Sequence, residues 1–168
     1  MNSKFLDTIM WIIVGSFGAV VIGLGWHVVF GPSRIEHQLE YGVSDPERAL
    51  FGPLGCGNPC VINANSGGVV HAFDNFVRIV QREKRVLVVN GACNSACAIL
   101  ADKARSNVCI TRHARFGFHK VRNLKTGART DPPQSKKITA WVNSHGGFPT
   151  EGVLVMKYSE AKQFWRTC

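Results

Sequence analysis

The chain has 168 residues, of which 45% are hydrophobic and 18% are charged. This balance excludes an intrinsically disordered protein and is typical of one domain with a real core. The formal net charge of +9 would suit an anionic partner such as nucleic acid, phospholipid or cell-wall polymer. The basic residues are scattered, however, and no nucleic-acid-binding motif accompanies them. We therefore expect no nucleic-acid partner and interpret the charge as solvated faces, with attraction to a membrane surface as a second possibility.

Residues 1–8 form a short polar tail. Residues 9–30 then make a block of 22 residues without Asp, Glu, Lys or Arg. At about 1.5 Å per residue, this block reaches roughly 33 Å as a helix, enough to cross a bilayer core of about 30 Å. Trp11 and Trp26 lie near its two ends, where indole rings favour the membrane interface. No clear cleavage site follows, so the sequence predicts an uncleaved transmembrane signal anchor.

Six cysteines are present in the part of the chain that follows this block: Cys56, Cys60, Cys93, Cys97, Cys109 and Cys168. None of their spacings gives the CxxC pairs of a zinc site, and we predict no metal and no cofactor. An even count behind an apolar segment favours disulfides in an oxidising compartment, which places the bulk of the chain outside the cytoplasm, in the periplasm. Free buried cysteines in a cytosolic protein are the alternative.

Residues 31–59 are interpreted as a juxtamembrane linker and an entry segment. Pro32 and the polar run after it suit a tether, and Asp45-Pro46 is typical of the start of a short helix. The turn-rich stretch that follows contains Cys56 and Cys60. These two could close a small ring, or each could pair elsewhere.

From residue 60 onward, strand-like and helix-like segments alternate. The predicted order is a strand at 60–64, a helix at 69–81, a strand at 86–89, a tight Asn90-Gly91 turn, a helix at 96–104 and a strand at 108–111. This βαβαβ order indicates an α/β layer fold. In such folds, sites gather at the carboxyl ends of the strands. The Gly67-Gly68 turn and Ser95 both fall at such ends.

Ser95 heads the second helix, where free backbone N–H groups favour developing negative charge. His119 follows on a later strand and could act as its base. Ser95 could equally be an ordinary helix N-cap and His119 a packed surface histidine.

Three segments together resemble a known family: Ile62-Asn-Ala-Asn-Ser-Gly-Gly68, Gly91-Ala-Cys-Asn-Ser-Ala-Cys97 and Phe116-Gly-Phe-His119. They look like the ClpP/crotonase superfamily, and most like the Clp protease proteolytic subunit with its secreted or membrane-bound bacterial relatives. The resemblance implies a ClpP-like domain of repeated β-β-α layers over residues 60–168. It also implies Ser95 as the nucleophile and His119 as the general base, 119 − 95 = 24 residues later. The N–H groups of Gly68 and Ala96 would then form the oxyanion hole.

The chain departs from the family where the third member of the triad is expected. No convincing aspartate is present, and Asp131, Glu151 and Glu160 each suit a surface charge better. The site would then be a Ser–His dyad, or inactive. Among the cysteines near the site, we expect bridges Cys97–Cys109 and Cys93–Cys168, with a thiol nucleophile at Cys93 or Cys97 as a minor alternative.

After His119, residues 122–133 are interpreted as a basic, turn-rich loop. An amphipathic helix is predicted at 135–144, with Ile138, Trp141 and Val142 facing inward. His145-Gly146-Gly147 would cap it, and a last helix is predicted at 159–166.

The sequence thus predicts a membrane-anchored, extracytoplasmic serine hydrolase that cleaves a peptide or protein substrate. Because the family often forms rings, a homo-oligomer is a further possibility. Two alternatives stay open. One is a catalytically inactive ClpP-fold module that binds or scaffolds at the membrane, and the other is a crotonase-like acyl-CoA enzyme.

Overall fold

The computed structural model of this protein describes residues 45–52 and 54–168. The predicted tail, the predicted membrane anchor and residues 31–44 of the linker lie outside the described residues. Within the described ranges, no helix has the length and apolar character needed to cross a bilayer. The first described element is α3 (Asp45–Phe51), the short helix that the Asp45-Pro46 signal predicts.

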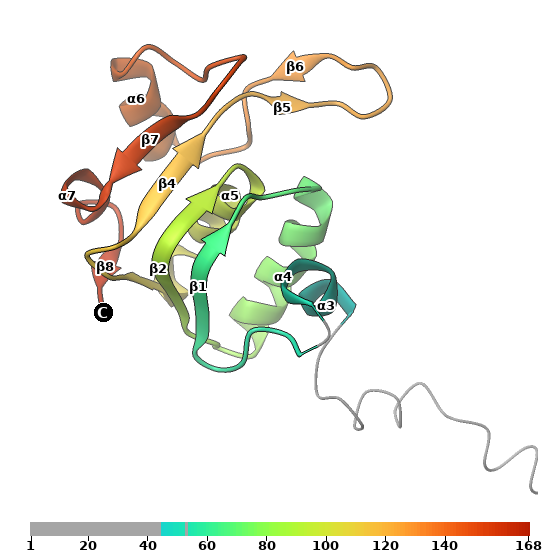
Figure 1. Cartoon of the computed structure of the whole chain (residues 1–168), viewed down its shortest axis with the longest axis vertical. Coiled ribbons are helices and arrows are strands. Elements are labelled where there is room, and N and C mark those ends of the chain that lie inside the picture. Colours follow the sequence, from blue (N-terminus) through green and yellow to red (C-terminus); the bar gives the residue numbers. More distant parts are fainter. Residues whose placement is uncertain (1–44, 53) are drawn as a thin grey trace, which may run out of the picture. The chain divides into compact units, whose positions relative to one another are not determined.

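One curled, mixed sheet of six strands organises the described residues (Figure 1). The strands are β1 (Cys60–Asn65), β2 (Leu87–Asn94), β3 (Val108–Ile110), β4 (Arg115–Phe118), β7 (Leu154–Lys157) and β8 (Arg166–Thr167). The central strand β2 pairs in parallel with β1 along one edge, and with β3 and then β4 along successive halves of the other. On the outside, β8 joins β3 in parallel and β7 joins β4 in antiparallel orientation.

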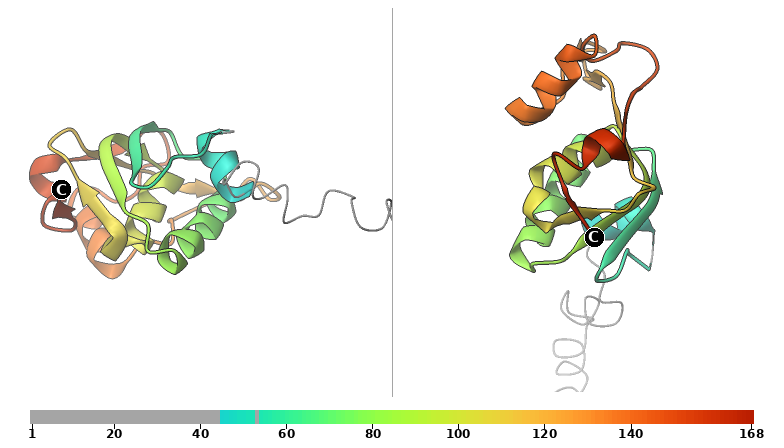
Figure 2. Two further views of the ribbon diagram at one scale, coloured as in Figure 1. Left: turned by 90° about the horizontal axis from the view of Figure 1, so that it is seen from below. Right: turned by 90° about the vertical axis from the view of Figure 1, so that its left-hand side faces the viewer.

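The predicted βαβαβ alternation is confirmed, because β1, β2 and β3 run parallel with helices α4 (Val70–Arg82) and α5 (Ala96–Lys103) between them. One side of α4 is buried, through Phe73, Phe76, Val77 and Val80, at the helical spacing that the sequence predicts. Val69, where the predicted helix 69–81 begins, precedes the observed helix and is exposed. Helix α5 consists mostly of small and apolar residues, and its first seven residues are buried. Both helices lie on the same side of the sheet (Figure 2).

The predicted Asn90-Gly91 turn is wrong, since β2 runs straight through both residues to Asn94. Gly91 is needed for a different reason. A Cβ at this position would collide with the Asn63 carbonyl, where the register of β1 on β2 shifts. The Asn90 side chain donates to Asn63 Oδ1 at 2.8 Å and accepts from Thr111 Oγ1 at 2.8 Å. A turn-type dipeptide here marks a close approach of two strands.

The segment after β4 contains a two-stranded hairpin, β5 (Val121–Arg122) and β6 (Arg129–Thr130), where the sequence predicts only a loop. Helix α6 (Lys136–Ser144) is confirmed, with Ile138, Trp141 and Val142 buried. The following glycines cap this helix as predicted, since Gly147 N–H donates to the Val142 carbonyl at 3.0 Å.

The last predicted helix, at 159–166, is wrong for most of its length. Helix α7 covers only Tyr158–Ala161, and the chain then extends into β8. Trp165 explains the change, because its ring stacks on Phe116 at 4.1 Å and its indole N–H donates to the Ala101 carbonyl at 2.9 Å. Burying this large side chain draws the end of the chain onto the sheet.

Three disulfides join all six cysteines: Cys56–Cys60, Cys93–Cys97 and Cys109–Cys168. The small Cys56–Cys60 ring is one of the two arrangements that the sequence allowed. The expected Cys97–Cys109 and Cys93–Cys168 bridges are wrong. Because β8 pairs with β3, the chain end lies beside Cys109, and the Cys109 and Cys168 Cα atoms are 4.9 Å apart. Three bridges suggest an oxidising, extracytoplasmic environment.

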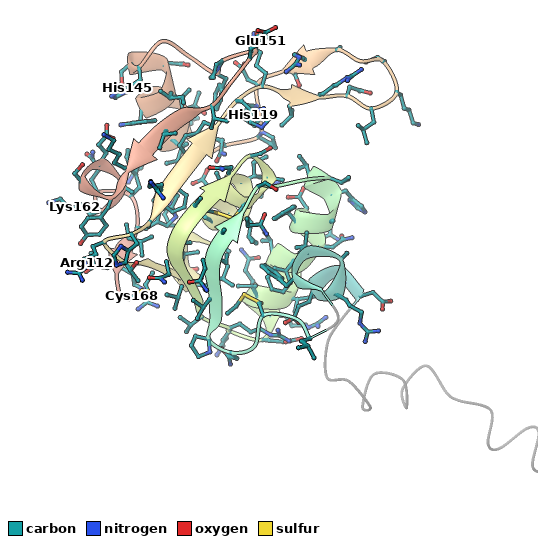
Figure 3. The ribbon with its side chains drawn as sticks, in the orientation of Figure 1. Arg112, His119, His145, Glu151, Lys162 and Cys168 are labelled. Atoms are coloured by element: carbon teal, nitrogen blue, oxygen red, sulfur yellow. A yellow bond between two sulfur atoms is a disulfide. The ribbon has the colours of Figure 1, made fainter. Side chains whose placement is uncertain are left out.

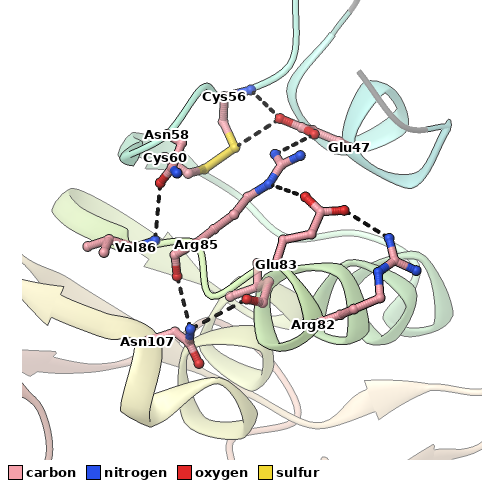
Figure 4. Close-up of polar contacts among 10 residues, drawn as sticks. Glu47, Cys56, Asn58, Cys60, Arg82, Glu83, Arg85, Val86 and Asn107 are labelled. Carbon is pink, nitrogen blue, oxygen red and sulfur yellow. Dashed lines mark hydrogen bonds and ion pairs between the residues drawn. A yellow bond between two sulfur atoms is a disulfide. The ribbon is translucent and has the colours of Figure 1, made fainter. Parts of the chain in front are cut away.

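A network of charges fastens α3 to the end of α4 (Figure 4). The Glu47 side chain is 2% exposed and accepts from Arg85 Nη1 at 2.7 Å, while Arg85 Nε donates to Glu83 at 2.7 Å. Hydrogen bonds from Arg82 and Arg85 hold the pKa of Glu83 below its usual value, against the opposing effect of burial. Burial alone would lower the pKa of Arg85, but the bonds to Glu47 and Glu83 outweigh it and raise that pKa.

The long disulfide should contribute most to global stability. Cys109 and Cys168 are 59 residues apart in sequence, against four for Cys56 and Cys60. In the chain-entropy model, removing the disulfide that closes the long loop lowers the free energy of unfolding by about 4 kcal/mol, and removing the one that closes the short loop lowers it by about 2 kcal/mol. Urea unfolding of Cys109→Ala/Cys168→Ala and of the control Cys56→Ala/Cys60→Ala checks this. Equal losses in free energy of unfolding would contradict it.

Glu83 should contribute to acid sensitivity. A carboxyl whose pKa is lowered on folding stabilises the protein fully above its unfolded pKa, and this contribution is lost as the pH falls through the folded pKa. We expect Glu83→Gln to remove part of the decline in thermal midpoint below about pH 4.5. The control is Glu151→Gln, at an exposed residue without an ion pair among those described. The same decline in thermal midpoint at low pH for wild type and Glu83→Gln would refute this role.

Candidate active site around Ser95

Ser95 is the single residue between the end of β2 and the start of α5. Its backbone has φ 56° and ψ −122°. Among the non-glycine residues described, only Lys84, with φ 52°, shares a positive φ. A side chain at positive φ crowds its own backbone, at a cost of about 1–3 kcal/mol. Such strain persists only where the surroundings impose it, and it is often found at active sites.

The Ser95 hydroxyl makes no capping hydrogen bond to α5, so the interpretation of Ser95 as an ordinary N-cap fails. Its backbone, by contrast, is held on both sides. Ser95 N–H donates to the Gly117 carbonyl on β4 at 2.8 Å, and the Ser95 carbonyl accepts from Ala98 and Ile99 in the first turn of α5. The strained turn is therefore tied to both the sheet and the helix, while the half-buried hydroxyl is not used to cap the helix.

The glycine pair after β1 comes up against this turn. A Cβ on Gly67 would lie 2.6 Å from the Ser95 Cβ and 2.9 Å from the Ala96 nitrogen, so only glycine fits. Gly67 itself is oriented by its N–H, which donates to Asn65 Oδ1 at 2.9 Å. The close approach falls one residue before Gly68, where a Cβ would meet only Phe73 at 3.7 Å. The backbone of the glycine turn thus borders both Ser95 and the Ala96 amide.

His119 directly follows β4 and lies at the base of the β5–β6 hairpin (Figure 3). Its Nδ1 is 2.7 Å from the Lys120 carbonyl oxygen. Since a carbonyl can only accept, Nδ1 donates in this bond, and in a neutral ring Nε2 then keeps its lone pair. This is the tautomer that a general base needs.

The sheet register relates His119 to Ser95. Asn94 is paired with Gly117, and His119 is two residues beyond Gly117, which is about 6–7 Å along an extended chain. No direct hydrogen bond joins Ser95 and His119 among the residues that the structure describes. In enzymes without substrate, such bonds are often long and tighten only in the complex. The topology places Ser95 and His119, the candidate nucleophile and base, in one region, but without a hydrogen bond between them.

The acids considered from the sequence do not reach His119. Asp131 and Glu151 are exposed, as expected for surface charges. Glu160 accepts from the Lys157 N–H at 3.2 Å and lies 3.5 Å from His145 Nε2. The orienting partner of His119 is therefore the Lys120 carbonyl, where a triad would have a carboxylate.

Sequence reasoning missed Asp102, a buried carboxylate on α5. Its side chain is 2% exposed, pairs with Arg105 and accepts from Ser135 Oγ at 2.9 Å. It thereby fastens the start of α6 to α5, which is a structural role. The signal for it was an acidic residue within an otherwise small and apolar helix.

A shallow depression of about 400 Å³ lies beside the His119 segment. Its lining includes Pro149, whose carbonyl accepts from the Lys120 N–H at 2.9 Å, and Val153, which packs against Gly117. The volume is within the range of small-ligand sites. Neither Ser95 nor His119 belongs to this lining, so the depression borders the segment after His119 and not the two candidate groups themselves.

The thiol alternative is excluded, because Cys93 and Cys97 are bonded to each other. Among the described residues, no group of three His, Cys, Asp or Glu side chains gathers as a metal site. No protein-family model matches the chain, and no curated protein is detectably similar to it.

The strain at Ser95 gives a stability prediction that does not depend on activity. Glycine tolerates positive φ, so Ser95→Gly should have a free energy of unfolding about 1 kcal/mol higher than Ser95→Ala. Ser106→Gly, at an exposed residue of the 3-10 turn η1 (Arg105–Asn107), should instead lower the free energy of unfolding relative to wild type. Chemical denaturation measures all three variants. A Ser95→Gly variant no more stable than Ser95→Ala would argue against strain.

Proposed function

We propose that this protein is an extracytoplasmic, membrane-anchored serine hydrolase of the ClpP-like kind that cleaves peptide bonds in peptide or protein substrates. The observation that carries the proposal is the backbone of Ser95, which is strained at positive φ between a parallel strand and a helix. This is the geometry of a nucleophile held at a sharp strand-to-helix turn. The resemblance to the ClpP/crotonase superfamily adds support. Each of the three resembling segments contributes one part of the site: the glycine turn, Ser95 or His119.

The chemistry follows from the roles of the groups around Ser95. His119 Nε2 takes the hydroxyl proton as Ser95 Oγ attacks the substrate carbonyl, and an acyl-enzyme forms when the protonated histidine passes that proton to the leaving amine. Water then attacks the acyl-enzyme. His119 takes the proton of this water and returns it to Ser95 Oγ as the carboxylic acid product leaves. The Ala96 N–H, at the start of α5, and an amide of the Gly67-Gly68 turn would stabilise the tetrahedral oxyanion.

The Lys120 carbonyl takes over one of the two duties of a triad carboxylate. It fixes the tautomer and orientation of His119, but as a neutral group it stabilises the imidazolium less than a carboxylate does. Triad enzymes that lose this acid are about 10⁴-fold slower. We therefore expect a slow hydrolase, with the serine reactive and the base correctly oriented.

A catalytically inactive ClpP-fold binding module at the membrane is the second candidate. It is favoured by the absence of a direct Ser95–His119 bond and of a carboxylate on His119 among the described residues. The two candidates differ in one measurable property, the nucleophilicity of the Ser95 hydroxyl.

A fluorophosphonate probe tests the proposal on the purified full-length chain, in detergent and without reductant. Attack by an activated Oγ on phosphorus expels fluoride and leaves a stable adduct. We expect labelling of wild type, its complete loss in Ser95→Ala and a decrease of about 10²–10⁴-fold in rate in His119→Ala.

The matched control is a serine and a histidine that do contact each other, in which Ser144 Oγ lies 3.1 Å from His145 Nδ1. Ser144→Ala and His145→Ala should label like wild type, because Ser144 donates to the Trp141 carbonyl and lacks a strained turn. A folded wild type that does not label would reject the hydrolase in favour of the binding module.

A further inference from the structure

The Cys93–Cys97 disulfide closes a ring around Ser95. Cys93 lies next to the end of β2, and Cys97 is the second residue of α5. Only Asn94, Ser95 and Ala96 stand between them, and both cysteines are fully buried. The bridge therefore joins the two elements whose junction holds the strained residue.

Each end of this bridge is anchored independently. Cys93 is in register with Asn65 on β1 and with Phe116 on β4, so the sheet holds it from both sides. Cys97 belongs to the buried first turn of α5, in the hydrophobic core. Between two fixed points, the three-residue segment has few conformations left. Without the bridge, no covalent link would hold the helix start to the strand end, and the turn at Ser95 would have more room to relax.

We propose that the Cys93–Cys97 disulfide is a positioning device that keeps Ser95 in its strained, reactive conformation, so that the serine becomes reactive only after oxidation. This inference rests on the proposed hydrolase function and adds a condition to it. Two thiols are oxidised to one disulfide with loss of two electrons and two protons, which the thiol oxidants of an oxidising compartment accept.

Because the Cys93–Cys97 bridge is buried, it should form once, during folding, and not be reduced again. Thiol–disulfide exchange requires the attacking thiolate to reach a sulfur atom, and neither sulfur belongs to an exposed residue. After folding, the bridge should resist reduction. The chain would therefore stay inactive while its cysteines are reduced in the cytoplasm and become active on folding outside it.

The experiment compares Cys93→Ala/Cys97→Ala with Cys56→Ala/Cys60→Ala in the full-length chain. The second pair is the matched control, because it closes a ring of the same sequence separation at the start of β1. Two readouts are taken. One is the rate of fluorophosphonate labelling, and the other is amide hydrogen exchange of the segment 92–99, which contains the Ser95 N–H bonded to Gly117.

We expect loss of the Cys93–Cys97 bridge to slow labelling at least tenfold and to speed exchange in this segment at least tenfold. The control should leave both within about twofold. Unchanged exchange in a folded variant overturns the inference, and so does faster exchange with undiminished labelling. If wild type fails to label, the hydrolase function fails, and exchange alone decides whether the bridge positions Ser95.

A second variant, Cys93→Val/Cys97→Ala, removes the bridge but restores most of the buried volume at position 93. It should exchange and label like the double-alanine variant. If both variants fail to fold while the control folds, the bridge supports the whole domain rather than one turn, and the inference is overturned.

Discussion

The site depends on the short connection between β2 and α5. The parallel strand must end, and the helix must begin, within a single residue, and Ser95 takes a backbone conformation that serines normally avoid. Three contacts surround this residue: the Ser95–Gly117 hydrogen bond, the close approach of the Gly67 backbone and the Cys93–Cys97 bridge. The rest of the fold can be understood as support for these contacts.

That support comes from the order of the strands. Because β2 is central, β1 brings the glycine turn to one side of Ser95, and β4 brings Gly117 and then His119 to the other. The buried Asp102 ties α6 to α5, and Trp165 holds the chain end against β4. At the end of the chain, Cys109–Cys168 closes the longest loop. Residues far from the site thus fix the elements that carry it.

Local patterns predicted the elements well where one period dominated. The apolar side of α4, the amphipathic α6 and the parallel order of β1, β2 and β3 all follow from spacing alone. Predictions failed where a distant contact decided the outcome. Gly91 looked like a turn residue but makes room for β1, and the last predicted helix gave way to the burial of Trp165.

The residues of the candidate site were chosen from the sequence, but their geometry could not be predicted from it. Sequence singled out Ser95, His119 and the glycine turn, yet neither the dihedral angles of Ser95 nor the carbonyl partner of His119 leaves a trace in residue types. The disulfide pairing was also out of reach, since six cysteines allow 15 arrangements and the correct one requires β8 to lie beside β3. These features are set by tertiary contacts.

A crystal structure of the full-length chain after reaction with a fluorophosphonate measures the central claim most directly. We expect continuous density from Ser95 Oγ to phosphorus, with Ser95 still at positive φ. The phosphoryl oxygen should lie within hydrogen-bond distance of the Ala96 N–H and an amide of the glycine turn. An unmodified Ser95 with a relaxed, negative φ would contradict a strained, reactive serine at this turn.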